Sequence, residues 1–156
     1  MKKHLTAIIA IGILVFVAAA CSGSFSTANI SKLEFGKNDK AEPAATSFDV
    51  GEKIYAVATA SNTSAKHKMT YKVTYENVAG KTKGEEALSE SIDFEGARPI
   101  WLAFTVPLPG EYKVEASLLD DTGKKVDSKS GNITAKGGAA PPPAASDTKK
   151  DDADDN

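Results

Sequence analysis

The residue types that most often carry catalysis or bind metal ions are scarce in this chain. Its 156 residues include one cysteine, two histidines, two methionines and one tryptophan. A single cysteine excludes a disulfide bond within the chain. Zinc sites usually take three or four Cys, His or acidic ligands, and Ser or Cys nucleophiles need a well-placed base. We therefore expect a protein that is not an enzyme and that holds no cofactor or metal ion.

An excess of basic charge is also lacking. The chain carries 19 basic and 21 acidic side chains, a formal net charge of −2. Without Lys2 and Lys3 the balance is 17 to 21, a net charge of −4. Proteins that bind nucleic acid neutralise its phosphates with basic side chains, so nucleic acid is not expected as a partner. No motif indicates a small-molecule substrate.

The N-terminus has the three parts of an export signal. Residues 2–4 (KKH) form a basic head, and residues 5–17 form an almost uninterrupted apolar run. Three alanines at 18–20 and then Cys21 follow it. This order is typical of a signal peptide. A retained membrane helix is one alternative, but about 16 apolar residues are few compared with the roughly 20 that span a bilayer. A signal peptide cut before Cys21 to leave a free thiol is another.

Three small residues directly before a cysteine resemble the lipobox of bacterial lipoproteins. Ala18 departs from that pattern, in which Leu or Val is usual at this place. The resemblance implies that residues 1–20 are removed and that Cys21, modified with a lipid such as palmitate, attaches the protein to a membrane. Ser22 is not the Asp that resembles an inner-membrane retention signal. The outer membrane is therefore expected in a two-membrane envelope, and the outer face of the cell membrane otherwise.

The rest of the chain divides into a tether, one domain and a tail. Residues 21–29 are small and polar, which predicts a short tether, and residues 30–136 are long enough for one domain. Residues 137–156 contain no large apolar side chain, three consecutive prolines and five aspartates against two lysines. Such a segment cannot bury enough surface to offset the entropy of ordering, so we expect disorder.

Short alternating segments between Gly, Asn, Asp and Pro signals predict an all-β domain. The expected strands are 30–35, 53–61, 69–77, 85–94, 99–106, 112–118 and 124–135, with a long loop over 36–51. About seven antiparallel strands predict a two-sheet sandwich. The segment 99–106 is the most apolar and is expected to be a central strand. In the last strand Val126 and Ile133 differ in parity, so Gly131 is expected to form a bulge or kink.

Alternation also predicts which side chains face the core. The expected inward residues are Met69, Tyr71, Val73, Tyr75, Ile100, Leu102, Phe104, Val106, Tyr112, Val114, Ala116 and Leu118. Trp101 then faces outward, where an exposed indole is a candidate binding contact. The alternative is a tryptophan covered by the 36–51 loop or by the tether.

A turn, a strand and a second turn follow one another in residues 109–123 (PGEYKVEASLLDDTG). They resemble the penultimate hairpin of immunoglobulin-like and fibronectin III-like domains. The resemblance implies a single Ig-like sandwich in which the hydroxyl of Tyr112 bonds back to a nearby backbone group. Two features depart from it, because the paired cysteines of antibody domains are absent and Trp101 lies on the strand before this hairpin. A fold of this kind implies no particular function.

Two other groups of residues are weighed as sites. His67 and Met69 would share a strand face and could contribute to a copper site, although a solvated loop histidine and a core methionine explain them more simply. Glu85, Glu86 and Glu90 could act in sugar hydrolysis, although acids near a turn usually form a solvated face. Aspartates of the tail could chelate a cation loosely but serve more simply for solubility: Asp151, Asp152, Asp154 and Asp155.

These observations favour a non-catalytic binding or structural module of the cell envelope. It would act on another envelope protein, through a sheet face around Trp101 or by strand addition at a sheet edge. An exported protease inhibitor is one alternative, presenting loops at 62–66 or 106–110. A metal carrier or small hydrolase is the other.

Lipid on Cys21 can be tested by mass. We expect protein from the membrane fraction to begin at Cys21 and to carry added acyl mass. Cys21→Ala should lose the acyl mass, because the alanine side chain has no thiol to acylate. Intact-mass spectrometry of both forms checks this. An unmodified chain in the soluble fraction would contradict lipidation and leave Cys21 as a free thiol.

Overall fold

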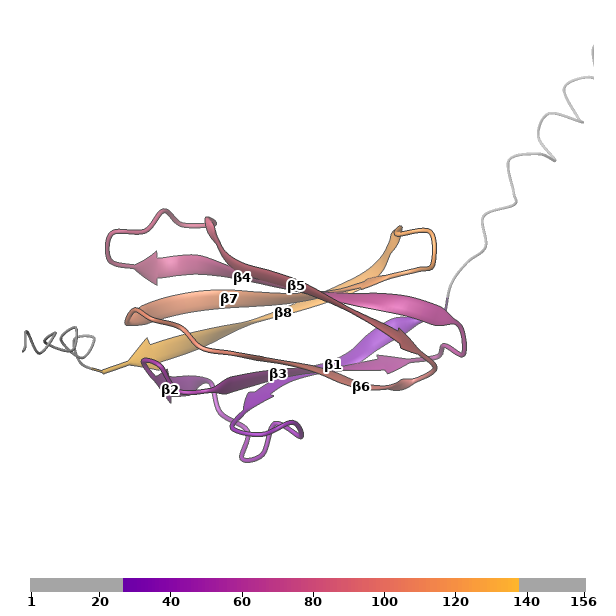
Figure 1. Ribbon diagram of the computed structural model, residues 1–156, viewed down its shortest axis with the longest axis horizontal. Helices are drawn as coiled ribbons and strands as arrows, with labels where there is room; N and C mark the ends of the chain where they lie inside the picture. Colours follow the sequence, from indigo (N-terminus) through magenta and orange to yellow (C-terminus); the bar gives the residue numbers. More distant parts are fainter. Residues whose placement is uncertain (1–26, 138–156) are drawn as a thin grey trace, which may run out of the picture.

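The computed structural model describes residues 27–137, which form an all-β fold of two sheets (Figure 1). The strands are β1 (Asn29–Gly36), β2 (Ser47–Asp49), β3 (Ile54–Ser61), β4 (Lys66–Val78), β5 (Glu86–Glu95), β6 (Arg98–Phe104), β7 (Gly110–Leu119) and β8 (Lys125–Lys136). One sheet has the order β1-β3-β6 and the other β2-β8-β7-β4-β5. No helix suited to crossing a membrane occurs within residues 27–137. The signal segment, Cys21 and all but the first residue of the predicted tail lie outside the described residues.

The seven expected strands are present, and the structure adds an eighth. β2 lies inside the segment 36–51 that the sequence predicts as a loop, and it pairs in parallel with the end of β8. Phe48, its middle residue, is buried. A three-residue strand with one apolar side chain gives no periodicity to read, which explains why the sequence does not reveal it.

The segment 99–106 contains an edge strand, so the expectation of a central strand is wrong. β6 is the last strand of the β1-β3-β6 sheet and pairs only with β3 in that sheet. Its apolar character has two sources, because Ile100 and Phe104 face the core while Trp101 and Ala103 lie on the other face. A strand of this composition reads as central although one of its edges is free. Pro99 is compatible with an edge, since proline has no N–H to donate to a second neighbour.

Gly131 is not the irregular point of β8. The pairing of β7 with β8 shifts between Leu118 and Leu119, which places the extra residue at Val126, while Gly131 pairs in regular register with Val114. Glycine is needed at 131 for another reason, because a Cβ there would lie 2.7 Å from Cε2 of Phe35. The Phe35 ring of β1 thus rests directly on the β8 backbone and joins the two sheets on that side.

Side-chain alternation predicts the core faces correctly. Most of the residues expected inward are buried, and only Leu102 is half-buried. The Tyr112 hydroxyl donates to the carbonyl oxygen of Leu108 at 2.8 Å, the return to nearby backbone that the hairpin resemblance implied. Tyr112 therefore ties the loop after β6 to the start of β7.

The hydroxyl of Tyr71 joins the two sheets in the buried core. Tyr71 lies on β4 and is fully buried. Its hydroxyl donates to the carbonyl oxygen of Ile100 at 2.7 Å and accepts from the N–H of Ala58 at 3.1 Å. Ala58 and Ile100 are cross-strand partners in β3 and β6. One side chain of the five-stranded sheet thus satisfies backbone groups on both strands at the β3–β6 junction.

We predict that Tyr71→Phe lowers the free energy of unfolding by about 1–3 kcal/mol, because two buried hydrogen bonds are lost while ring packing is kept. Urea unfolding of the two forms measures this. Tyr112→Phe is the matched control, since it removes a single bond near the surface and should cost less. Equal stability of Tyr71→Phe and wild type would show that β3 and β6 pair fully without the hydroxyl.

The same variant tests a pH dependence. Burial raises the pKa of Tyr71 above its ordinary value, so the folded state favours the neutral phenol. This stability is fully present below the unfolded pKa near 10 and is lost as pH rises through the folded pKa. As pH rises from the unfolded pKa near 10 toward the folded pKa, we expect the wild type to lose up to about 1.4 kcal/mol per pH unit more than Tyr71→Phe. Parallel pH profiles of the two proteins would contradict this expectation.

Candidate functional site

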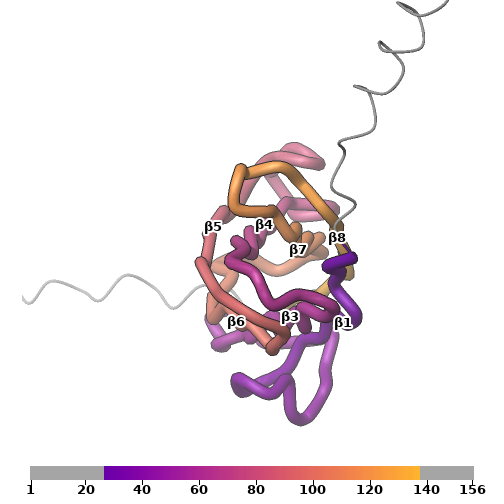
Figure 2. The backbone as a smooth tube through the Cα atoms, turned by 90° about the vertical axis from the view of Figure 1, so that its right-hand side faces the viewer, coloured from indigo at the N-terminus to yellow at the C-terminus, as the bar shows by residue number. Residues whose placement is uncertain are grey.

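The two sides of the fold are closed differently. On one side β1, β2 and β8 meet, with β2 paired to β8 and the Phe35 ring on Gly131. On the other side lie β5 and β6, each the last strand of its sheet (Figure 2). A turn joins β5 to β6, and the two strands separate with distance from that turn (Figure 1). A groove of about 460 Å³ lies along them, lined by Ile92, Asp93, Phe94, Arg98, Pro99, Ile100, Trp101, Leu102 and Ala103.

Trp101 stands on the outer face of this open side, as its parity predicts. Its side chain is 48% exposed, and it is the one large apolar side chain exposed within residues 27–137. The indole ring lies 5.7 Å from the Tyr55 ring, at 56°. Val57 is the cross-strand partner of Trp101 and is only 5% exposed although it lies on the outer face. Trp101 therefore helps to cover Val57, while about half of the tryptophan side chain stays exposed.

The backbone of β6 has free hydrogen-bonding groups next to this indole. The Ile100 carbonyl faces β3, since it accepts from the Tyr71 hydroxyl that also binds β3. Backbone groups alternate in direction along a strand. Pro99, Trp101 and Ala103 therefore direct theirs away from β3, toward the open side. Two N–H groups and three carbonyl groups are presented there, because proline supplies no donor.

A second observation supports this direction. The Thr59 carbonyl of β3 accepts from the Ser31 hydroxyl of β1 at 3.2 Å, so it faces away from β6. Thr59 is the cross-strand partner of Pro99. Pro99 and Thr59 thus form a cross-strand pair that exchanges no backbone hydrogen bonds. Proline fits only this kind of pair without the loss of a hydrogen bond between the strands. The sequence contains this signal in Pro99, since proline within a strand indicates an edge.

The neighbouring edge strand β5 is protected in a different way. Glu90 pairs with Tyr71 of β4 in register and so lies in the same row as the half-buried Leu88 and Ile92. Glu90 itself is exposed. A charged side chain pointing inward on an edge strand opposes pairing with another chain. Of the two edges, β6 is the one with an apolar surface and free backbone groups together.

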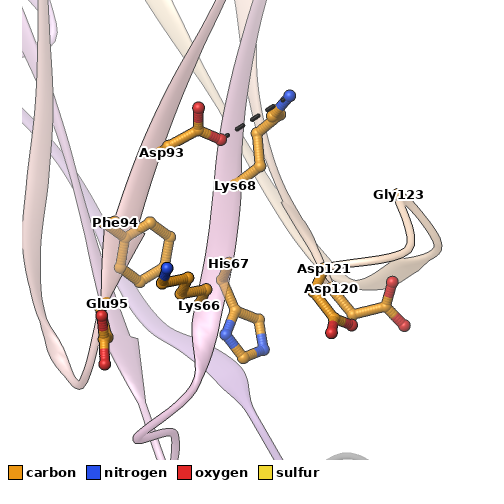
Figure 3. Close-up of a pocket in the computed structure, with 9 residues that line it drawn as sticks. All are labelled: Lys66, His67, Lys68, Asp93, Phe94, Glu95, Asp120, Asp121 and Gly123. Carbon is orange, nitrogen blue, oxygen red and sulfur yellow. Dashed lines mark ion pairs between the residues drawn. The ribbon is translucent and has the colours of Figure 1, made fainter.

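A second pocket lies near His67, and here the sequence expectation is wrong (Figure 3). His67 is a buried residue of β4, 7% exposed, and not a solvated loop histidine. Its Nδ1 lies 3.1 Å from both Thr63 Oγ1 and Ala65 O, and its ring centroid lies 6.0 Å from that of the tilted Phe94 ring. The flanking lysines hide this in the sequence, because they occupy the outward face of the same strand.

The pocket beside His67 measures about 590 Å³ and carries charges of both signs. Lys68 pairs with Asp93 at 3.7 Å, and the β7–β8 turn contributes two aspartates. The Asp120 carboxylate accepts from the N–H groups of Thr122 and Lys124 and from the Thr122 hydroxyl. These bonds lower the pKa of Asp120, and the bond from the Thr122 hydroxyl has the largest effect. Asp120 therefore shapes the turn.

The remaining candidates of the sequence lie apart from any assembled site. Met69 is fully buried in the core, as expected. Glu86 pairs with Lys72 at 3.2 Å, and Glu85 accepts from the N–H of Thr82 at 3.2 Å. Within residues 27–137 no three His, Cys, Asp or Glu side chains gather in a way that could hold a metal ion.

Comparison with known proteins gives weak structural likenesses. No protein-family model and no curated protein matches the chain. A family 76 glycoside hydrolase from a bovine Bacteroides thetaiotaomicron strain is 16% identical, with a TM-score of 0.43 over 68% of this chain and 20% of that one. The PmoD soluble domain from Methylocystis sp. ATCC 49242 (Rockwell) is 10% identical, with a TM-score of 0.41 over 67% of this chain and 89% of that one. The chain thus spans a fifth of the hydrolase's length.

The direction of the β6 backbone predicts opposite effects of proline at adjacent positions. Ala103→Pro should change stability by less than about 1 kcal/mol, because it removes only an outward N–H. Leu102→Pro should cost about 3 kcal/mol or more, because it removes an N–H that faces β3. Leu102→Ala separates the lost packing from the lost bond. Urea unfolding gives the three values. A large loss in Ala103→Pro would show that its N–H faces β3.

Proposed function

We propose that this protein is a lipid-anchored, non-catalytic binding module of the cell envelope with an Ig-like sandwich domain. Antiparallel pairing between most strands and the Tyr112 hydroxyl bond to Leu108 support the Ig-like assignment. The lipobox-like segment that ends at Cys21 supports the membrane anchor. The module would act on another envelope protein.

The single observation that carries the binding role is the position of Trp101 beside a free strand edge. An exposed indole offers a large, rigid contact area, and tryptophan is enriched among residues that dominate binding energies. The free N–H and C=O groups of Trp101 and Ala103 offer backbone pairing to an added strand. Both kinds of contact are available to one partner at one place.

Site-directed photocrosslinking in cells tests this function. A photoreactive phenylalanine analogue replaces Trp101 in the full-length protein, and a matched control replaces Glu111. Glu111 is exposed on β7 of the other sheet, and its neighbour Tyr112 faces the core. We expect a crosslinked envelope protein from position 101 and not from 111. Ala103→Pro should abolish the product, because it blocks the free edge.

The tryptophan itself is tested by substitution. Trp101→Ala should leave the domain folded, since half of the side chain is exposed, and should weaken partner capture at least tenfold, because dominant contacts are worth about 2 kcal/mol or more. Circular dichroism and co-purification measure the two effects. The same product from positions 101 and 111, or a Trp101→Ala variant that unfolds, would overturn the binding surface.

A further inference from the structure

We propose that the pocket beside His67 binds a small organic cation that carries an ammonium group and an apolar body. This inference goes beyond the proposed function and does not depend on it, because the partner surface proposed above is built on Trp101 and the β6 edge. It follows from three features of the pocket: an unused ring nitrogen of His67, two aspartates that form no ion pair, and an aromatic wall.

The imidazole of His67 has one nitrogen that the fold leaves unused. Its Nδ1 lies 3.1 Å from the carbonyl oxygen of Ala65. A carbonyl oxygen only accepts hydrogen bonds, so Nδ1 carries the proton, and in the neutral ring Nε2 is an acceptor. Nε2 has no partner within residues 27–137, although the residue is only 7% exposed. Such a nitrogen calls for a hydrogen-bond donor from a ligand.

This nitrogen is accessible from the pocket. Every buried side-chain nitrogen or oxygen of the described residues has a partner, so Nε2, which has none among them, is not closed off. His67 lines the pocket, and Figure 3 shows its ring beside the turn that carries Asp120 and Asp121. The register of β4 and β7 explains this placement. Lys68 pairs with Leu119, which brings the next residue of each chain, His67 and Asp120, to the same end of the sheet.

Asp120 adds a carboxylate oxygen that the turn does not use. Its Oδ1 accepts all three bonds that shape the turn, from the N–H groups of Thr122 and Lys124 and from the Thr122 hydroxyl. Oδ2 has no hydrogen bond with another described residue. A carboxylate oxygen only accepts, so Oδ2 requires a donor, as Nε2 of His67 does. An ammonium group has three N–H donors and can serve both atoms.

The charge of the pocket favours a cation. Two lysines of β4 stand opposite two acids of β5 in register, so that their charges balance: the pairs are Lys66 with Glu95 and Lys68 with Asp93. Asp120 and Asp121 remain, and neither forms an ion pair within residues 27–137. Lys124, whose charge acts on Asp120, does not line the pocket. A cation in the pocket would therefore complement the two aspartates.

The aromatic wall sets the rest of the ligand. Phe94 is the cross-strand partner of His67 and also lines the pocket. A volume of about 590 Å³ is in the range of small-molecule sites. A short apolar body can therefore rest against Phe94 while the ammonium group reaches His67 and Asp120. A bare metal ion fits less well, because no three His, Cys, Asp or Glu side chains of the described residues gather around one point.

The test is isothermal titration calorimetry of the full-length protein in non-ionic detergent at neutral pH. The probe is phenethylammonium, which joins a primary ammonium group to a phenyl ring. Trimethylated phenethylammonium keeps the charge but has no N–H, and phenylpropionate joins a similar body to a negative charge. The blocked tripeptide Gly-Lys-Gly presents the same ammonium group as a protein side chain.

We expect phenethylammonium to bind and the other three probes to bind at least tenfold more weakly. His67→Asn should weaken binding about tenfold, because the new amide can still donate to the Ala65 carbonyl but offers no acceptor in place of Nε2. Asp120→Asn should have a similar effect, since its amide oxygen can accept the turn bonds while the charge is lost. Glu111→Gln removes an equal charge at the opposite end of β7 and should leave the affinity unchanged. Circular dichroism checks that each variant is folded.

Other outcomes overturn the inference. Equal binding of the trimethylated probe would show charge attraction without an N–H donor, and tighter binding of phenylpropionate would show an anion site. Tighter binding of the tripeptide would identify a lysine side chain of a protein as the ligand. Equal affinity of wild type and both asparagine variants would place the ligand elsewhere. If no probe binds while position 101 still crosslinks a protein in cells, this site fails and the proposed function holds.

Discussion

The hydroxyl of Tyr71 is the contact on which the rest of the arrangement depends. It reaches from β4 of the five-stranded sheet to the junction of β3 and β6, where it accepts from the Ala58 N–H and donates to the Ile100 carbonyl. A buried hydroxyl without partners would cost free energy, so these bonds fix the distance between the sheets as well as stabilise them. They also fix the direction of the β6 backbone, because the Ile100 carbonyl must face the hydroxyl. β6 has a free edge because it is the last strand of its sheet, and the same contact decides which of its backbone groups point there.

The asymmetry between the two sides leaves one side open among the described residues, and this is the side on which we propose that a partner binds. On the β1 and β8 side, the Phe35 ring packs on Gly131 and the short strand β2 pairs with β8. On the β5 and β6 side, no such closure occurs among the described residues. A free edge is a hazard because it can pair with any extended chain. Glu90 on β5 and Pro99 on β6 reduce that hazard in part, and they leave a short stretch at Trp101 and Ala103.

A binding role fits what the chain has and what it has little of. One histidine remains in the domain, and it is buried with its Nδ1 beside Thr63 and Ala65. The surface acids near β5 are spread along a strand and partly paired with lysines. By contrast, the exposed indole of Trp101 and the free backbone groups lie together on the edge strand β6. The proposed chemistry is recognition by shape and strand pairing.

The sequence by itself determined seven of the eight strands, their inward faces and the outward direction of Trp101, because these follow from a two-residue period that each segment carries locally. It also contained Pro99, a sign of an edge. Only the tertiary structure decided which strands end each sheet, that His67 is buried, and that Gly131 is needed beneath Phe35. These depend on contacts between residues far apart in the chain, such as Tyr71 with Ile100, and no local pattern encodes which distant strand a given strand will meet. An apolar strand reads the same whether one or both of its edges are paired, so the candidate site appeared only once the sheets were assembled.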